Sequence, residues 1–234
     1  MIFIGLHGES QSGKSMLAGL LEKKFQVPTV RTSFSHFVRE EIKNISIRDT
    51  NEILFELLFN CENNPERAQN LRNMVELCIR FEKENWNLEE RPASNESRKI
   101  QQYWGQDFRR GQDEKHWIRK HFIEHFSSYD YSDFHKDTVM LEESVRQPNE
   151  RDYIHALNGV VLSLKSLKAP TKTEEKNRSH SVEQIARSFT GDIIVDMAEY
   201  FNFTKDIDRD KFLDKLVKEI REIHQQRLDN NHSV

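Results

Sequence analysis

One segment of the sequence has the residue types and spacing of a phosphate-binding loop. Residues 8–15 match the pattern G-x-x-x-x-G-K-S in full. The glycines let the backbone curl so that several N–H groups point at phosphate oxygens, and the N-terminus of a following helix adds positive potential. We expect Lys14 to span the β- and γ-phosphates of a nucleoside triphosphate and the Ser15 hydroxyl to ligate Mg²⁺. The expected triphosphate-binding residues are Gly8, Glu9, Ser10, Gln11, Ser12, Gly13, Lys14 and Ser15.

The elements on either side of this loop must hold it in place. Residues 1–6 form a short apolar run, which is typical of a strand buried on both faces of a parallel sheet. From Lys14 onward, apolar side chains recur at helical spacing. This predicted apolar face comprises Met16, Leu17, Leu20, Leu21 and Phe25. Strand, glycine loop and amphipathic helix predict the first βα unit of an α/β fold.

The middle of the chain indicates helices instead. Residues 49–85 show two apolar faces separated by Asn63-Asn64-Pro65, which predicts an antiparallel helical pair. Residues 86–98 are polar and predict a loop, and a further helix is expected from Asp113 to about Phe126. The first two faces comprise Ile53, Leu54, Leu57 and Leu58, then Leu71, Met74, Val75, Cys78 and Ile79. The further helix is expected to point Trp117, Ile118, Phe122 and Phe126 inward.

An alternation of strands and helices resumes in the last third of the chain. We predict strands over 138–143, 160–164 and 193–195, a helix over 148–157, and an amphipathic helix near the C-terminus. Strands alternating with helices favour a parallel sheet flanked by helices. Between the last two strands, the lysine-rich residues 166–181 predict a mobile loop. The C-terminal helix is expected to bury Phe212, Leu213, Leu216, Ile220 and Ile223.

Composition narrows the class of protein. The chain has 234 residues, 36% hydrophobic and 32% charged, which suits a globular protein with a heavily charged surface. The net charge of −4 argues against non-specific nucleic-acid binding, because that needs a concentrated basic face. No apolar run approaches the roughly 20 residues of a membrane span. The two cysteines, Cys61 and Cys78, are too few for a disulfide framework. We therefore expect a cytoplasmic protein.

Four further segments lie downstream of the loop, in order. They are Arg31-Thr32-Ser33-Phe34-Ser35-His36-Phe37-Val38-Arg39; Gly105-Gln106-Asp107-Phe108-Arg109-Arg110 with Asp113 and Trp117; Val145-Arg146-Gln147-Pro148-Asn149-Glu150; and His180-Ser181-x-Glu183. Together with the loop, over about residues 1–200, they resemble the phage deoxynucleoside monophosphate kinase family. The resemblance implies a single P-loop NTPase domain, a three-layer α/β fold. Its core would comprise 1–48 and 105–234, with a helical acceptor-binding insertion over 49–104.

The resemblance also implies a reaction and a set of residues. ATP, with Mg²⁺, would phosphorylate a deoxynucleoside 5′-monophosphate, and guanidinium groups would clamp the acceptor phosphate because their forked donors match its oxygens. The catalytic residues would be Lys14, Arg109, Arg110 and Arg146. Acceptor binding would fall to Arg31, Ser33, Phe34, Arg39, Trp104, Gln106, Asp107, Trp117 and Glu150, and a lid would use Lys168 and Arg178. Alternatively, Trp117 packs in a core and Glu150 favours the dipole of a helix start.

One position departs from the family pattern. The family has Asp where this chain has Ser144, preceded by Glu142 and Glu143. The acidic group near Mg²⁺ would then be Glu143 or Glu9, or catalysis would be weakened. Because side chains alternate along a strand, Glu142 and Ser144 should share one face and Glu143 should take the other.

Three functions follow from the sequence. The first is the deoxynucleoside monophosphate kinase, with ATP and Mg²⁺ as cofactors. The others are a P-loop kinase of another small acceptor, and a nucleotide-binding regulatory protein with impaired catalysis. In each case the expected partner is a small-molecule nucleotide rather than a nucleic acid or membrane, in the host cytoplasm if the protein is phage-encoded, with a homodimer left open.

Overall fold

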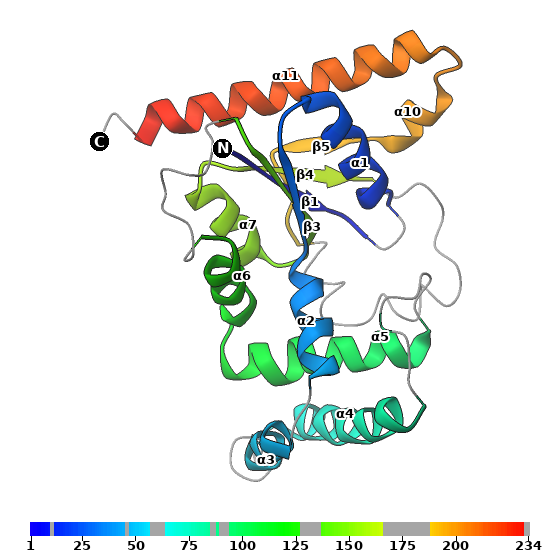
Figure 1. The fold of residues 1–234 in the computed structure, drawn as a ribbon, viewed down its shortest axis with the longest axis vertical. Coiled ribbons are helices and arrows are strands. Elements are labelled where there is room, and N and C mark those ends of the chain that lie inside the picture. Colours follow the sequence, from blue (N-terminus) through cyan, green and yellow to red (C-terminus); the bar gives the residue numbers. More distant parts are fainter. Residues whose placement is uncertain are drawn as a thin grey trace. The chain divides into compact units, whose positions relative to one another are not determined.

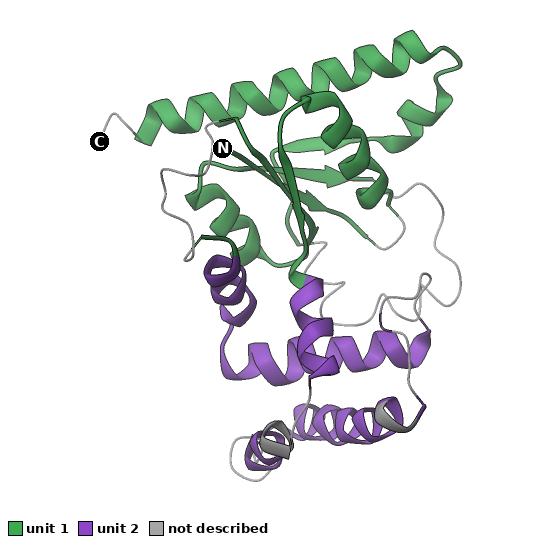
Figure 2. Cartoon of the chain, in the orientation of Figure 1, with its two compact units in different colours: residues 1–34, 125–234 green, residues 35–124 purple. Residues whose placement is uncertain are grey.

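The computed structural model of the chain describes residues 1–9, 12–44, 47–56, 64–84, 88, 94–126, 137–165 and 188–231, without the side chains of 47–50, 82 and 83. The chain forms two compact units, drawn in green and purple in Figure 2. Unit 1 comprises residues 1–34 and 125–234, and unit 2 comprises residues 35–124. The helical insertion expected over 49–104 lies inside unit 2, which extends beyond it at both ends.

Unit 1 is built on a parallel sheet. Its described strands pair in the order β2-β3-β1-β4-β5, so the first strand lies in the middle, hydrogen-bonded to β3 and β4 (Figure 1). This confirms the predicted α/β class with a parallel sheet flanked by helices. The strands are β1 (Ile2–His7), β2 (Thr29–Thr32), β3 (Val139–Val145), β4 (Val160–Leu164) and β5 (Ile193–Val195).

Helices cover both faces of this sheet. One face packs against α1 (Lys14–Phe25) and α11 (Asp206–Asn231), and the other against α7 (Pro148–Ala156). The β1-to-β2 and β3-to-β4 crossovers run in opposite directions along the sheet. Because such crossovers are right-handed, α1 and α7 must lie on opposite faces. The short helix α10 (Met197–Asn202) precedes α11.

The sequence predicted β1, β4 and β5 closely but not β2. Residues 29–32 contain one large apolar side chain, Val30, which is exposed on an edge strand, so the segment lacks the apolar run of a buried strand. The prediction that Met16 faces the core was also wrong. The buried face of α1 is centred on Leu17, Ala18 and Leu21. Each residue turns the helix by about 100°, so Met16 lies about 100° or more from each of these three and points to the exposed side.

Unit 2 is helical. Two helices are present over 49–85, as predicted, and the antiparallel arrangement stays a prediction. Leu54 and Ile79, expected to be buried, are half-exposed, because Leu54 lies about 100° around its helix from Ile53 and Ile79 about 140° from Met74. Phe122 is exposed for the same reason, about 140° around α6 from the buried Trp117. The loop predicted over 86–98 is wrong at its end, where the Ser94 hydroxyl caps a helix by accepting from Ser97 N. The helices are α2 (Phe34–Lys43), α3 (Ile47–Phe55), α4 (Pro65–Glu84), α5 (Asn95–Gln102), the π-helix η2 (Tyr103–Arg110) and α6 (His116–Phe126).

The helix predicted from Asp113 begins three residues later, at His116. In α6, Trp117 and Phe126 are buried as expected. Leu57, Leu58 and the loop over 166–181 lie outside the described residues. None of the described helices is long and apolar enough to cross a membrane.

Candidate functional site

The loop between β1 and α1 has a backbone that its glycines permit. Gly8 has φ +151° and Gly13 φ +91°, conformations that other residues rarely adopt. A Cβ on Gly8 would lie 2.7 Å from Ser12 Oγ and 2.9 Å from the carbonyl of Leu164. The spacing of the two glycines is therefore a structural requirement of this turn. Ser10 and Gln11 lie outside the described residues.

The ammonium group of Lys14 lies over this loop. Its Nζ donates to the carbonyls of Gly8 and Glu9, both at 2.7 Å, and to Ser12 Oγ at 3.4 Å. Ser12 is fully buried, whereas Ser15, in the first turn of α1, is exposed. The first N–H groups of a helix have no partner within it and give its N-terminus a positive potential. A cation, a helix start and an exposed hydroxyl thus meet at one turn.

The position of the loop in the sheet favours ligand binding. All strand pairs in the described sheet are parallel, so the carboxyl ends of the strands share one edge. At β1 and β4 the chain leaves in opposite directions, toward β2 and β5 respectively. Ligands of open α/β sheets bind outside the carboxyl ends at such a switch point. The loop at 8–15 follows β1 at that point.

The end of β3 divides its acidic residues between the two sides of the strand. Glu143 Oε1 accepts from Arg31 Nε at 2.6 Å, and the same guanidinium lies 3.5 Å from the Ser15 carbonyl oxygen. Glu142 and Ser144 instead contact each other. These contacts agree with the predicted alternation. Arg31, predicted to bind the acceptor, links Glu143 to the first turn of α1.

Glu142 is fully buried. Its Oε1 accepts from the backbone of Ser144 at 2.7 Å, the hydroxyl of Ser144 at 2.8 Å and the backbone of Phe34 at 3.1 Å. Burial raises the pKa of Glu142 to about 8, and the nearby charge of Glu150 adds to this, because the neutral donors do not offset the loss of water. At neutral pH the group is therefore mostly a neutral acid.

Glu150 and Arg146 lie at the start of α7. The Glu150 carboxylate accepts from the backbone N–H groups of Arg146 at 2.7 Å and Gln147 at 3.0 Å, completing a capping box. This is the helix-start role that the sequence left open for Glu150. The cap fixes the chain where Arg146 follows β3, at the same edge of the sheet as the loop at 8–15. Phe34 is buried, with its ring 6.5 Å from that of Tyr153.

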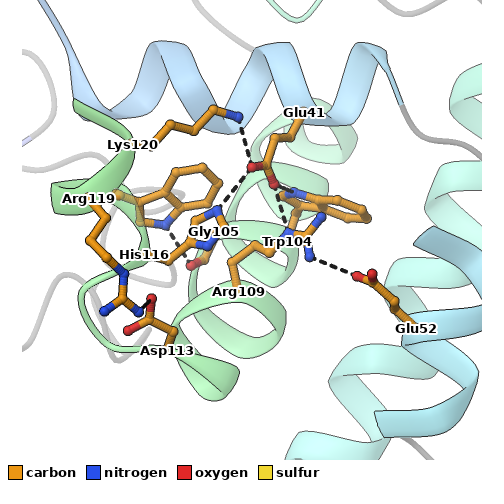
Figure 3. A network of polar contacts seen from close by, with 10 residues as sticks. Glu41, Glu52, Trp104, Gly105, Arg109, Asp113, His116, Arg119 and Lys120 are labelled. Atoms are coloured by element: carbon orange, nitrogen blue, oxygen red, sulfur yellow. Dashed lines mark hydrogen bonds and ion pairs between the residues drawn. The ribbon is translucent and has the colours of Figure 1, made fainter. Parts of the chain in front are cut away.

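In unit 2, the carboxylate of Glu41 is the centre of a polar network (Figure 3). Both of its oxygens are engaged by side chains of η2 and α6. The donors are Trp104 Nε1 at 3.0 Å, Arg109 Nε at 2.8 Å, His116 Nε2 at 3.0 Å and Lys120 Nζ at 2.8 Å. Burial alone would raise the pKa of Glu41, but these donors hold it well below its usual range. The network ties α2 to η2 and α6.

The residues predicted from the G-x-D-x-x-R segment lie in or beside this network. Arg109 also donates to Glu52 at 3.1 Å, so its charge is matched by the two carboxylates of Glu41 and Glu52. Its guanidinium packs over the ring of Trp104. Trp117 is buried and donates to the Gly105 carbonyl at 3.0 Å, which is the core position that its helical face indicated. Asp107 is half-buried, and burial raises its pKa to about 6.

The other predicted residues of unit 2 are more dispersed. Arg39 is buried and bonds Ser35 Oγ at 3.0 Å. Arg110 lies 3.4 Å from the Glu114 carbonyl oxygen, and Gln106 is half-buried. Lys168 and Arg178, predicted for a lid, lie outside the described residues.

The structure brings together, within unit 1, the described loop residues, Arg31, Ser33, Arg146 and Glu150. Sequence reasoning missed the roles of Glu41 and Glu142. Glu41 gave no signal, because its partners lie 63 to 79 positions further along the chain. Glu142 did give one, since a glutamate inside an apolar strand is rarely buried without a reason.

Comparisons with known proteins do not bear on these assignments, because neither the protein-family models nor the curated proteins searched gave a match to the chain.

Proposed function

We propose that this protein is a P-loop phosphotransferase that moves the γ-phosphoryl group of ATP to a deoxynucleoside 5′-monophosphate. The observation that carries the proposal is the loop at 8–15. It joins a buried central strand to a helix at the switch point of a parallel sheet, with the Lys14 ammonium held over it by two carbonyls. A phosphate chain offers this ammonium stronger acceptors than backbone carbonyls, because its oxygens are charged.

The residues near Ser15 suit Mg²⁺, which takes oxygen ligands, keeps several waters and usually binds one or two protein groups plus substrate phosphates. Ser15 would supply its hydroxyl, and Glu143, linked to Ser15 through Arg31, is the described carboxylate best placed to hold the ion's water shell. When bound, the ion neutralises charge on the β- and γ-phosphate oxygens. Glu143 therefore takes the part that the family pattern gives to an Asp at position 144.

The transfer itself needs no covalent enzyme intermediate. An oxygen of the acceptor phosphate forms a bond to the γ-phosphorus while the bond from that phosphorus to its bridging oxygen breaks, and ADP leaves. Lys14 and the loop amides hold the donor phosphates. Arg146, fixed beside the capped start of α7, is our first choice for the acceptor clamp in unit 1. Arg109 is a weaker choice, because Glu41 and Glu52 already match its charge.

A coupled assay of ADP formation with the four deoxynucleoside monophosphates tests this function. Lys14→Ala should lower activity by at least a hundredfold and weaken ATP binding. Lys23→Ala, an exposed lysine on the same helix, is the matched control and should do neither. Absence of ADP formation with every monophosphate would refute the kinase, and the panel extended to sugars and small acids would then test another acceptor.

One observation favours a second candidate, a nucleotide-binding regulatory protein with little catalysis. Ser144 stands where the family has Asp, and its hydroxyl bonds Glu142 rather than facing Ser15. This candidate predicts ATP binding that depends on Lys14, with turnover near background for every acceptor. Calorimetry with ATP beside the coupled assay separates the two functions.

A further inference from the structure

Two hydroxyls and a carboxyl form a hydrogen-bonded chain at the carboxyl edge of the sheet in unit 1. Ser33 Oγ lies 2.9 Å from Ser144 Oγ, which lies 2.8 Å from Glu142 Oε1. Ser33 follows β2 and is half-exposed, Ser144 is buried near the end of β3, and Glu142 is fully buried. These hydrogen bonds therefore link a half-exposed serine at the edge of the sheet to a carboxyl inside the protein.

The direction of this chain is fixed by the backbone. Glu142 Oε1 also accepts from the backbone N–H groups of Ser144 and Phe34, which can only donate. Oε1 is thus an acceptor whether or not the carboxyl is ionised, because an acid proton would be carried by the other oxygen. The Ser144 hydroxyl must then donate to Oε1, and its single hydrogen is committed. Ser33 in turn must donate to Ser144.

Such a chain constrains what Ser33 can recognise. A serine hydroxyl has one hydrogen and two lone pairs. Since that hydrogen points inward to Ser144, Ser33 can only accept a hydrogen bond from a group on its outer side. An ionised phosphate has only acceptors, so it is excluded as the contact of Ser33.

We propose that Glu142 and Ser144 are positioning residues that make Ser33 an acceptor for a neutral donor group of the monophosphate substrate, either its sugar hydroxyl or an N–H group of its base. The inference rests on the proposed function and names the substrate group that the site recognises. Burying an acid is costly. The local irregularity supports a role at the edge. Between Gly5 and His7 of β1, the partner on β3 advances from Glu142 to Val145, so β3 carries one extra residue there. Such bulges re-aim side chains beside ligand sites.

The test measures binding by calorimetry, with ATP alone and with whichever deoxynucleoside monophosphate binds wild-type protein. Two analogues of that monophosphate are included, one lacking the 3′-hydroxyl and one lacking the N–H donor of the base. Ser33→Ala should weaken the monophosphate about tenfold, as expected for one lost hydrogen bond, and leave ATP binding within twofold. Ser33→Thr should recover most of the loss. Thr29→Val, at the other end of β2, is the matched control because its hydroxyl donates to the nearby carbonyl oxygen of Val27, at 3.1 Å.

The analogues identify the donor. One analogue should bind wild-type protein about as weakly as the unmodified monophosphate binds the Ser33→Ala variant. The Ser33→Ala change should not weaken the binding of that analogue further. Ser144→Ala should weaken the parent and not that analogue. Equal weakening of parent and both analogues by Ser33→Ala would overturn the inference and leave the kinase standing. Binding of ATP without any monophosphate would overturn both.

Discussion

Two buried or half-buried glutamates, one in each unit, have pKa values shifted in opposite directions. Glu41 in unit 2 receives hydrogen bonds from an arginine, a lysine, a histidine and an indole, and its pKa falls. Glu142 in unit 1 receives hydrogen bonds from two backbone N–H groups and a hydroxyl, and its pKa rises to about 8. Several donors surround each carboxylate, so the number of hydrogen bonds does not explain the difference. The charge of the donors and the depth of burial do. Glu142 is fully buried among neutral donors, whereas Glu41 is partly exposed and receives cations, which stabilise a carboxylate more than neutral donors do.

The comparison separates two uses of a carboxylate. The Glu41 network matches charge with charge and joins three helices, which is a structural role. Glu142 is held as a neutral acid at the edge that carries the loop at 8–15, and strongly perturbed groups beside a ligand-binding edge are candidates for function. Removing each glutamate should therefore damage a different property of the protein.

The largest expected effect is loss of stability on removing the charge of Glu41. Glu41→Gln leaves Arg109 without its main partner in a largely buried place, and we expect the free energy of unfolding to fall by about 3 kcal/mol. Lys120→Met removes a partner at the half-exposed side of the network and should cost less than about 1 kcal/mol. Urea denaturation at pH 7 measures both. Equal losses would mean that the network is not organised around Glu41.

The pH dependence of stability should differ in sign between the two sites. Because the folded pKa of Glu142 is raised, the folded protein keeps its proton where the unfolded chain has lost it. The Glu142 contribution therefore declines as pH rises from about 4.5 to about 8. Between pH 6 and pH 7, wild type should lose at most about 1.4 kcal/mol relative to Glu142→Gln. Denaturation of both proteins at each pH gives the difference, and a constant difference would show that Glu142 is ionised when folded.

Glu41 should respond to acid instead. Its folded pKa is lowered, so its contribution is complete above the unfolded value of 4.5 and declines as pH falls below it. The advantage of wild type over Glu41→Gln should thus be constant from pH 6 to pH 8 and shrink by about 1 kcal/mol or more near pH 3.5. Thermal unfolding from pH 3.5 to pH 8 follows it. Because other carboxylates titrate in the same range, only the difference between the two proteins is informative.

The sequence predicted most of what local patterns can encode. The strands β4 and β5 follow from residue types over a few positions, and the structure confirms them. The described residues of the segment 8–15 lie between β1 and α1 as predicted, and the phosphate-binding role of this segment stays a prediction. The edge strand β2 has too few apolar residues to stand out, and the extra residue in β3 depends on its pairing with β1. The Glu41 network joins α2 to helices more than sixty residues away, so only tertiary packing creates it. Arg109, predicted as a catalytic residue on its motif, stands in that network, and its role stays a prediction.

A third carboxylate, Asp107, tests how the surroundings of a carboxylate set its pKa, and its substitution has the smallest expected effect. Asp107 lies in η2, and one of its oxygens, Oδ2, is buried without a hydrogen-bond partner among the described residues. Burial raises the pKa of Asp107 to about 6. It outweighs a hydrogen bond from the side chain of Asn70 and the charge of Arg67, which both lower this pKa. Asp107 is thus intermediate between Glu142, with neutral donors, and Glu41, with several cations.

Asp107→Asn should therefore change stability by less than about 1 kcal/mol at pH 7.5, because a carboxylate with an unsatisfied oxygen is replaced by a neutral group of the same shape. Wild type should gain stability relative to the variant as pH falls from about 6 to about 4, since the folded protein takes up the proton first. Denaturation at pH 4, 6 and 7.5 measures the trend. A gain in the opposite direction would mean that Arg67 already holds Asp107 ionised, and that a single nearby cation is enough to place a carboxylate in the class of Glu41.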